Sequence, residues 1–164
     1  MTDELKQASI AAFSNAMHFQ CAAHLALGNI QIAGGAVTTN LAFSCELYLK
    51  AALIAEGQNA HGHRLDVLFS RLPVIHAKEI ERRYNDRLKD GQMNLRDSLT
   101  EVGDAFLISR YVHERDHTKI RVGVIGVIVQ ILVVYLPHAF SHFEANREHQ
   151  RFLAGQELAR ISSN

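Results

Sequence analysis

The segment RYVHERDH, residues 110–117, concentrates the side chains of this sequence that are best suited to chemistry. On an α-helix, Arg110, His113, Glu114 and His117 fall at i, i+3, i+4 and i+7, so all four lie along one stripe. His113-Glu114-x-x-His117 fits the zinc-hydrolase pattern H-E-x-x-H. Arg110 could bind a phosphate group, and His117, with six residues between the two, could transfer a proton near neutral pH. The stretch therefore predicts either a metal site or a phosphodiester-cleaving site.

In the zinc interpretation, His113 and His117 would bind the metal and Glu114 would activate a water molecule. A third ligand could come from Glu144 or Glu148. The two residues inside the motif are charged, however, whereas the helices of metalloproteases are usually apolar there. Zinc hydrolysis is therefore the remote alternative, and we expect neither a metal nor another cofactor.

A purely structural interpretation also fits the segment. Arg110 and Glu114 would then form an ordinary i,i+4 ion pair, worth only about 0.3–0.5 kcal/mol. Basic residues such as His113 and His117 near a helix C-terminus would simply complement the helix dipole.

Composition limits the class of protein that can carry this segment. The chain has 164 residues, of which 48% are apolar and 21% charged, as expected for one globular domain spanning residues 1–164. Its formal net charge is zero, so any contact with nucleic acid must be local. The longest apolar run, Val122–Leu136, is shorter than the roughly 20 residues that a bilayer requires. The N-terminus lacks the features of a signal peptide. We therefore expect a soluble cytoplasmic protein without a membrane contact.

Hydrophobic spacing predicts helices almost throughout the chain. The predicted helices run from about Glu4 to Leu27, from Thr39 to Gly57, from about Leu95 to Asp116, and from Val122 onward, with short helices after His63 and after Pro73. The segment from Val122 is apolar all round and is expected to be fully buried, at the bundle centre or at a dimer interface, with Pro137 kinking or ending it. The predicted fold is an all-α, up-and-down bundle of four main helices plus short extra helices.

Two polar features near the second helix have ordinary structural explanations. Glu46 and Lys50 stand at i,i+4 in the favourable order, which predicts an exposed or subunit-bridging pair. His63 immediately precedes a short helix that is expected to start at Arg64, and we expect its side chain to cap that helix.

Three stretches in order along the chain resemble proteins of the HEPN superfamily. CELYLKAALIAEG, from Cys45, followed by GHRLDVLF, from Gly62, is similar to the second-helix and loop pattern of those proteins. GDAFLISRYVHE, from Gly103, resembles their fourth helix. The resemblance covers roughly Leu41 to His117, and each of its motifs is short and degenerate.

The resemblance implies a helical homodimer, and many HEPN proteins are metal-independent endoribonucleases of toxin–antitoxin or defence systems. It implies catalytic roles for Arg110 and His117, with the motifs of two subunits facing each other across a cleft. It also implies RNA as a substrate and an antitoxin or another protein as a partner. Active members often carry Asn, Asp or His directly after the arginine, where this chain has Tyr111. A catalytically silent HEPN-like module that binds nucleic acid, a nucleotide or a protein is therefore the alternative.

The chemistry of the leading hypothesis follows from the residue types. Arg110 would hold the phosphate and stabilise the charge of the transition state. His117 would act as acid or base, because an imidazole titrates near neutral pH. Tyr111, His113 and Glu114 would line the substrate site.

Overall fold

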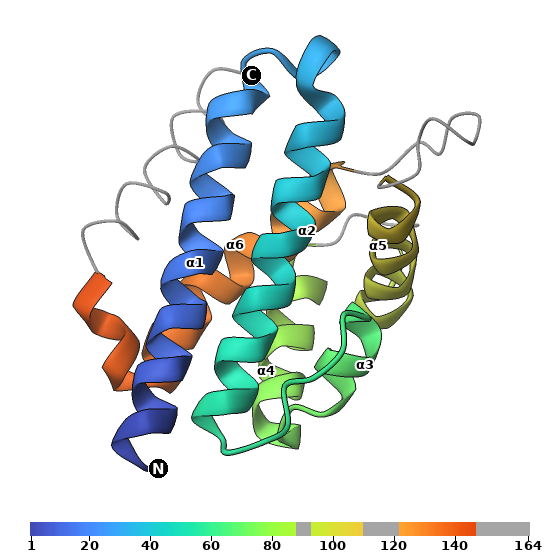
Figure 1. The fold of residues 1–164 in the computed structure, drawn as a ribbon. Helices are drawn as coiled ribbons and strands as arrows, with labels where there is room; N and C mark the ends of the chain where they lie inside the picture. Colours follow the sequence, from blue (N-terminus) through green and yellow to red (C-terminus); the bar gives the residue numbers. More distant parts are fainter. Residues whose placement is uncertain (88–92, 110–121, 147–164) are drawn as a thin grey trace.

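The computed structural model describes residues 1–87, 93–109 and 122–146 of the chain. These residues form an all-α helical bundle without any strand in the described ranges (Figure 1). Two long helices, α1 (Asp3–Leu27) and α2 (Ile30–Ala55), run antiparallel and make the most extensive helix–helix contact of the fold. The predicted fold class is confirmed.

Helix α1 has the bounds that the sequence predicts to within about one residue, whereas α2 starts earlier than predicted. Thr2 caps α1 by accepting a hydrogen bond from the backbone N–H of Leu5 at 3.3 Å. The prediction that α2 starts at Thr39 is wrong, because α2 begins at Ile30 and kinks at Ala33 (φ −107°, ψ 15°). Gly34-Gly35 continue the helix, since packing along α1 outweighs the low helix propensity of glycine.

The end of α2 lies where the sequence predicts it. Gly57 has φ +66°, a left-handed conformation that glycine adopts without steric cost. Its N–H donates to the carbonyl of Ile54 at 2.9 Å, and the N–H of Gln58 donates to the carbonyl of Leu53 at 2.8 Å. These two bonds are those of a Schellman motif, so the predicted glycine cap is confirmed.

Three shorter helices follow the hairpin along the chain, namely α3 (Leu65–Ser70), α4 (Val74–Asn85) and α5 (Leu95–Ser109). Helices α3 and α5 pack against α2. Leu65, Leu68 and Phe69 bury the inner face of α3. Pro73 occupies the N-cap position of α4, so it marks the start of that helix rather than the end of α3. The predicted continuation of α5 to Asp116 lies outside the described residues.

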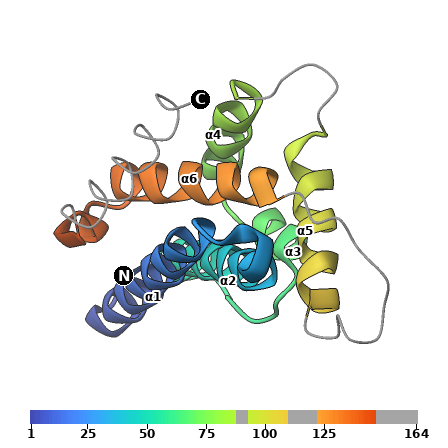
Figure 2. The ribbon, with the colours of Figure 1, turned by 90° about the horizontal axis from the view of Figure 1, so that it is seen from above.

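Helix α6 (Val122–Ala139) lies between the α1–α2 pair and α4, as Figure 2 shows from above. By length and composition it could cross a membrane, and 56% of it is buried inside the fold. Ile125, the run Ile128–Val133 and the run Tyr135–Pro137 are buried. Within the single chain its first turns are not fully buried, since Gly123 is exposed and Val127 is half-buried, so the prediction of burial at the bundle centre is wrong for that part. Burial of these turns at a dimer interface stays a prediction. Pro137 does not end the helix, which continues to Ala139.

A buried polar network fixes how α6 sits on the hairpin. The hydroxyl of Tyr48 donates to Oε1 of Gln20 at 2.8 Å, and Nε2 of Gln20 donates to Oε1 of Gln130 at 3.3 Å. These three side chains come from α2, α1 and α6. A shift of α6 by one residue would leave buried amide groups without partners, which opposes such a shift.

The chain then folds back onto α1 through the 3-10 helix η2 (Ser141–Asn146). The Phe143 ring stacks on Phe13 with their centroids 4.6 Å apart, and Nε2 of His142 lies 3.1 Å from Oγ of Ser9. The sequence predicts a more polar helical tail over residues 137–161. Its first residues belong to α6, which ends at Ala139, and residues 141–146 form the 3-10 helix. Residues 147–161 of the predicted tail lie outside the described residues.

Candidate functional site

The residues of the predicted catalytic segment lie outside the described part of the chain. This holds for Arg110, Tyr111, His113, Glu114 and His117. Helix α5 is described as far as Ser109, the residue that directly precedes Arg110. The proposed roles of these residues therefore stay predictions.

The zinc hypothesis also depends on residues outside the described ranges. His113, His117 and the candidate third ligand Glu148 are among them, whereas Glu144 is an exposed residue of η2. The described residues contain no group of three His, Cys, Asp or Glu side chains that could hold a metal ion.

A polar cluster within the described residues lies on the segments that carry the HEPN resemblance. We call it the Glu46 cluster; it consists of Glu46 and Lys50 on α2 and His63 in the connection from α2 to α3. One carboxylate oxygen of Glu46, Oε1, accepts from Nζ of Lys50 at 2.7 Å and from Nδ1 of His63 at 3.0 Å. The three side chains therefore meet at a single oxygen atom.

Glu46 is buried, which the sequence analysis did not predict. The whole Glu46 residue is 4% exposed to solvent, and the side chain of Lys50 is 19% exposed. The prediction of an exposed or subunit-bridging Glu46–Lys50 pair is therefore wrong for the glutamate. The charge of Lys50 compensates the buried carboxylate, which could otherwise be held away from water only at a considerable cost.

His63 does not cap the short helix, contrary to the sequence prediction. Arg64 occupies the N-cap position of α3 and makes no side-chain capping bond. The φ of +97° at Gly62 belongs to the turn that precedes His63. The imidazole instead points to Glu46 while 70% of the side chain is exposed to solvent. One edge of the ring is thus fixed to a buried carboxylate while most of the side chain faces solvent.

The partner of Nδ1 defines the tautomer of His63. Because an ionised carboxylate can only accept, Nδ1 must carry a proton to bond Glu46. In the neutral ring the lone pair then resides on Nε2. No hydrogen bond to Nε2 is formed within the described residues, so this nitrogen can accept a proton from a molecule in solution.

The second carboxylate oxygen of Glu46 has an unusual environment. Oε2 is buried, and no hydrogen-bond donor reaches it from within the described ranges. An unsatisfied buried polar atom costs about 1–3 kcal/mol, more if it is charged, and such atoms call for an explanation. Polar groups kept at a cost to stability are characteristic of functional sites.

Helix α5 lies against the start of α3. A methyl group added to Gly103 would lie 3.7 Å from the backbone nitrogen of Leu65, in ordinary van der Waals contact. Leu65 follows His63 by two positions, so α5 packs against the start of α3. The six residues from Gly103 to Ser109 advance the helix by about 9 Å.

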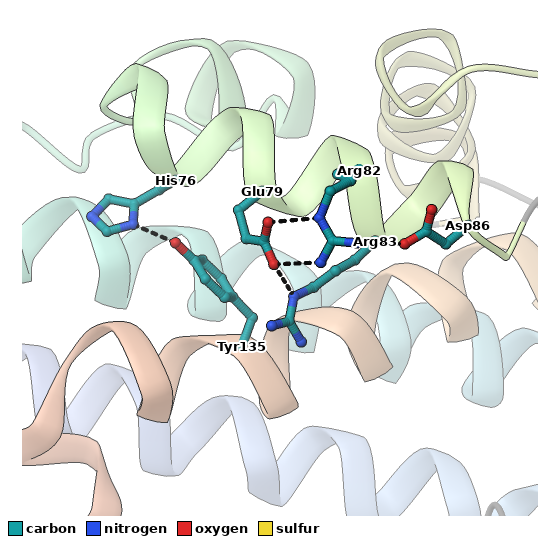
Figure 3. A network of polar contacts seen from close by, with 6 residues as sticks. All are labelled: His76, Glu79, Arg82, Arg83, Asp86 and Tyr135. Atoms are coloured by element: carbon teal, nitrogen blue, oxygen red, sulfur yellow. Dashed lines mark hydrogen bonds and ion pairs between the residues drawn. The ribbon is translucent and has the colours of Figure 1, made fainter.

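A second polar network joins α2, α4 and α6, and Figure 3 shows most of its members. Nδ1 of His76 lies 2.6 Å from the hydroxyl of Tyr135, and Nε2 of His76 lies 2.9 Å from Oε1 of Glu56. Burial raises the pKa of the Tyr135 phenol, and the nearby Glu79 raises it further. The phenol therefore keeps its proton and donates to Nδ1, which leaves Nε2–H to donate to Glu56. Both ring nitrogens of His76 are thus engaged within the protein.

Arginine side chains complete this second network on α4. Arg83 places its guanidinium 5.3 Å from the centre of the Tyr135 ring and bonds Glu79 at 2.7 Å. Hydrogen bonds from Arg82 and Arg83 lower the pKa of Glu79 to about 2 (Figure 3). Glu79 therefore stays ionised at any physiological pH. The network holds α4 against α6, with its polar groups paired to each other.

The sequence contains a signal for the buried Glu46 that the i,i+4 pairing obscured. Ala42, Glu46, Leu49 and Leu53 are spaced by four, three and four residues, and all four are buried on α2. A carboxylate in such an apolar stripe indicates a buried charge. Its partner His63 could not be identified in the same way, because it lies 17 residues further along the chain.

No family model, no curated protein and no solved structure matches this chain.

Proposed function

We propose that this chain is a HEPN-like, metal-independent endoribonuclease that acts as a cytoplasmic homodimer of the toxin or defence type. The observation that carries the proposal is the Glu46 cluster. The stretches that resemble HEPN proteins supply its three side chains, and one buried carboxylate oxygen of Glu46 has no hydrogen-bond partner among the described residues. The bundle itself is of the helical class that the resemblance implies.

In the proposed reaction, the ribose 2′-oxygen attacks the adjacent phosphorus while a base removes its proton. The bond from phosphorus to the 5′-oxygen breaks, and an acid protonates that oxygen. The products are a 2′,3′-cyclic phosphate and a 5′-hydroxyl. Arg110 binds the phosphate, His117 transfers a proton, and Tyr111, His113 and Glu114 line the substrate site. An antitoxin or another protein partner would control such an activity.

The test is incubation of the purified protein with total RNA in EDTA, followed by mapping of the cut ends. The control is the double variant Arg110→Ala/His117→Ala, purified in the same way. Cyclic-phosphate ends that only the parent produces are the expected result. EDTA also separates this mechanism from zinc hydrolysis through His113 and His117, which requires a bound metal.

A second candidate is a catalytically silent HEPN-like module that binds nucleic acid, a nucleotide or a protein partner. The observation that favours it is Tyr111, at a position where active members often carry Asn, Asp or His. Intact RNA after incubation with the parent, together with retained RNA binding, would select this candidate. A metal assay on the purified protein would then decide whether the remote zinc alternative is dropped.

A further inference from the structure

We propose that the outer face of α1 is the surface through which two copies of this chain associate, with their α1 helices antiparallel about a two-fold axis. The inference concerns association alone and does not depend on RNA cleavage. It assigns a specific interface, within the described residues, to the proposed homodimer.

Helix α1 presents one exposed face along almost its whole length. The exposed residues recur at intervals of three and four, which places them on one side of the helix: Ala8, Ala11, Asn15, His18, Ala22 and Leu25. The other side carries the buried residues Phe13, Met17 and Gln20, and the helix packs chiefly on α2. Figure 2 shows α1 on the side of the bundle away from α4. The outer face is therefore open to a partner.

This face belongs to the longest stretch of the chain without a charged side chain. No Asp, Glu, Lys or Arg occurs from Gln7 to Cys45, although these four residue types make up 21% of the sequence. A helix face that stays in water normally carries charged residues, whereas the core of a protein–protein interface is depleted of them. In a two-fold interface any charge near the axis also lies close to its own copy. The absence of charge therefore favours contact with a second copy.

The order of residues along the face is self-complementary. If two α1 helices pack antiparallel with the axis between residues 16 and 17, the residues of the face oppose each other in pairs. The opposed pairs are Ala11 with the partner's Ala22, Asn15 with the partner's His18, and Ala8 with the partner's Leu25. Small side chains then meet small ones, polar meets polar, and the largest lies against a small one. Such a series permits two helices to approach closely.

The two ends of α1 carry apolar side chains that cover each other in this arrangement. Met1 and Leu5 are exposed at the first end, and Leu25, 81% exposed, and Ile30 are exposed at the other. The antiparallel pair brings the first end of one helix against the second end of its partner. Apolar surface that faces water in the single chain is then removed from it at both ends.

Charge is complementary at the same places. The first turn of α1 contains Asp3 and Glu4. Helix α2 starts beside the other end of α1, with no acidic residue in its first turn and no side-chain capping bond from Asn29. The N-terminus of a helix is the positive end of its dipole and stabilises nearby carboxylates. In the antiparallel pair the acidic turn of each copy lies near this N-terminus of the other, which identifies a second copy as the occupant.

The experiment is sedimentation velocity of the purified full chain over a series of concentrations. The parent is expected to form dimers. Ala22→Glu inserts a carboxylate into the close contact twice per dimer and should raise the dissociation constant at least about 100-fold. Because Ala22 is exposed in the single chain, the far-ultraviolet circular dichroism should stay that of the parent.

Gly123→Glu is the matched control on the first turns of α6, the rival surface for self-association. Gly123 is exposed, and a methyl group added there would meet nothing within 4 Å, so the substitution fits the folded chain. The dissociation constant of this variant should stay within about threefold of the parent.

A charge pair tests the antiparallel register. In Ala11→Lys/Ala22→Glu each new lysine faces a new glutamate of the partner, so the double variant should dimerise at least about tenfold more tightly than Ala22→Glu. The two positions are about 16 Å apart along one helix, too far to pair within a chain. Ala11→Glu/Ala22→Glu, which opposes like charges, should remain monomeric.

Each contrary outcome removes a defined part of the inference. A parent that stays monomeric up to about 100 μM overturns it. A dimer that Gly123→Glu dissociates and Ala22→Glu does not also overturns it, because the contact then lies on α6. A double variant that binds no more tightly than Ala22→Glu contradicts the antiparallel pairing. RNA cleavage is tested independently: an α1-mediated dimer that leaves RNA intact sustains this inference without the proposed cleavage, and a monomer that cuts RNA does the reverse.

Discussion

The described part of the chain contains two histidine–glutamate pairs in which the buried partner differs: it is the carboxylate in one pair and the imidazole in the other. In the pair His63–Glu46 the carboxylate is buried, with 5% of its side chain exposed, and the imidazole is 70% exposed. In the pair His76–Glu56 the imidazole is enclosed, with 12% exposed, and the carboxylate is 33% exposed. The distances are nearly the same, 3.0 and 2.9 Å, so burial distinguishes the pairs rather than contact length.

This difference separates a structural pair from one suited to chemistry. His76 uses both ring nitrogens to join Glu56 on one side and Tyr135 on the other, and its ring lies 5.0 Å from that of Phe140. His63 uses one nitrogen inside the protein, and its carboxylate keeps a buried oxygen without a partner from the described residues. We therefore expect the first pair to stabilise the fold and the second to contribute little to its stability.

The largest expected effect on stability comes from His76→Ala. The change removes two hydrogen bonds, leaves the buried hydroxyl of Tyr135 without its acceptor and opens space beside Phe140, so the free energy of unfolding should fall by about 2–4 kcal/mol. Urea denaturation followed by circular dichroism measures this. His63→Ala, at a largely exposed site, is the control and should change the same quantity by less than about 1 kcal/mol. Equal losses in the two variants would remove the distinction between the pairs.

Tyr135→Phe should have an intermediate effect. The substitution keeps the ring beneath Arg83 and removes only the hydroxyl that donates to His76, so a loss of about 1–2 kcal/mol is expected. In the double variant His76→Ala/Tyr135→Phe the two losses should not add, because each change breaks the same bond. Additive losses in urea denaturation would show that the hydrogen bond contributes little.

Glu46→Met should have a small effect on stability, despite the burial of the side chain. Replacing a buried charge by an apolar side chain of similar size removes the cost of the open oxygen, and the half-buried Lys50 can reach water. The free energy of unfolding should stay within about 1 kcal/mol of the parent or rise. A loss above about 2 kcal/mol would mean that Glu46 is kept for structure, like Glu56.

The last prediction concerns the chemical reactivity of Cys45, the residue that directly precedes Glu46. Burial raises the pKa of Cys45 far above its usual value, with a further rise from Glu46, and burial also raises the pKa of Cys21. A raised pKa lowers the thiolate fraction at pH 8, so a disulfide reagent should modify half-buried Cys21 slowly and Cys45 only after unfolding. In denaturant both thiols should react quickly. Rapid native modification of Cys45 would contradict the burial of this face of α2.

The sequence was sufficient for the parts of the fold that local signals determine. The predicted helix ends at Leu27 and Gly57 lie where α1 and α2 end in the structure, since glycine caps depend on neighbouring residues. The start of α2 was predicted wrongly. Pro137 was predicted to kink or end the last long helix, and α6 does not end there. Tertiary packing determines both, because the contact with α1 and the enclosure of α6 outweigh local propensities.

Some features of the candidate site could likewise be predicted from local sequence patterns, whereas others depend on the packed fold. The spacing of Arg110 and His117 is a local pattern and could be recognised in the sequence, although both residues lie outside the described ranges. Glu46 and Lys50 were recognised as a pair, but the burial of Glu46 depends on the packed bundle. The contact with His63 requires the turn at Gly62 and the placement of α3, which no short sequence pattern specifies.

The most direct test of the account is a side-by-side urea denaturation of Glu46→Met and His76→Ala. The account predicts that the free energy of unfolding of Glu46→Met stays within about 1 kcal/mol of the parent or rises. It predicts that His76→Ala loses about 2–4 kcal/mol. Comparable losses in the two variants would contradict it.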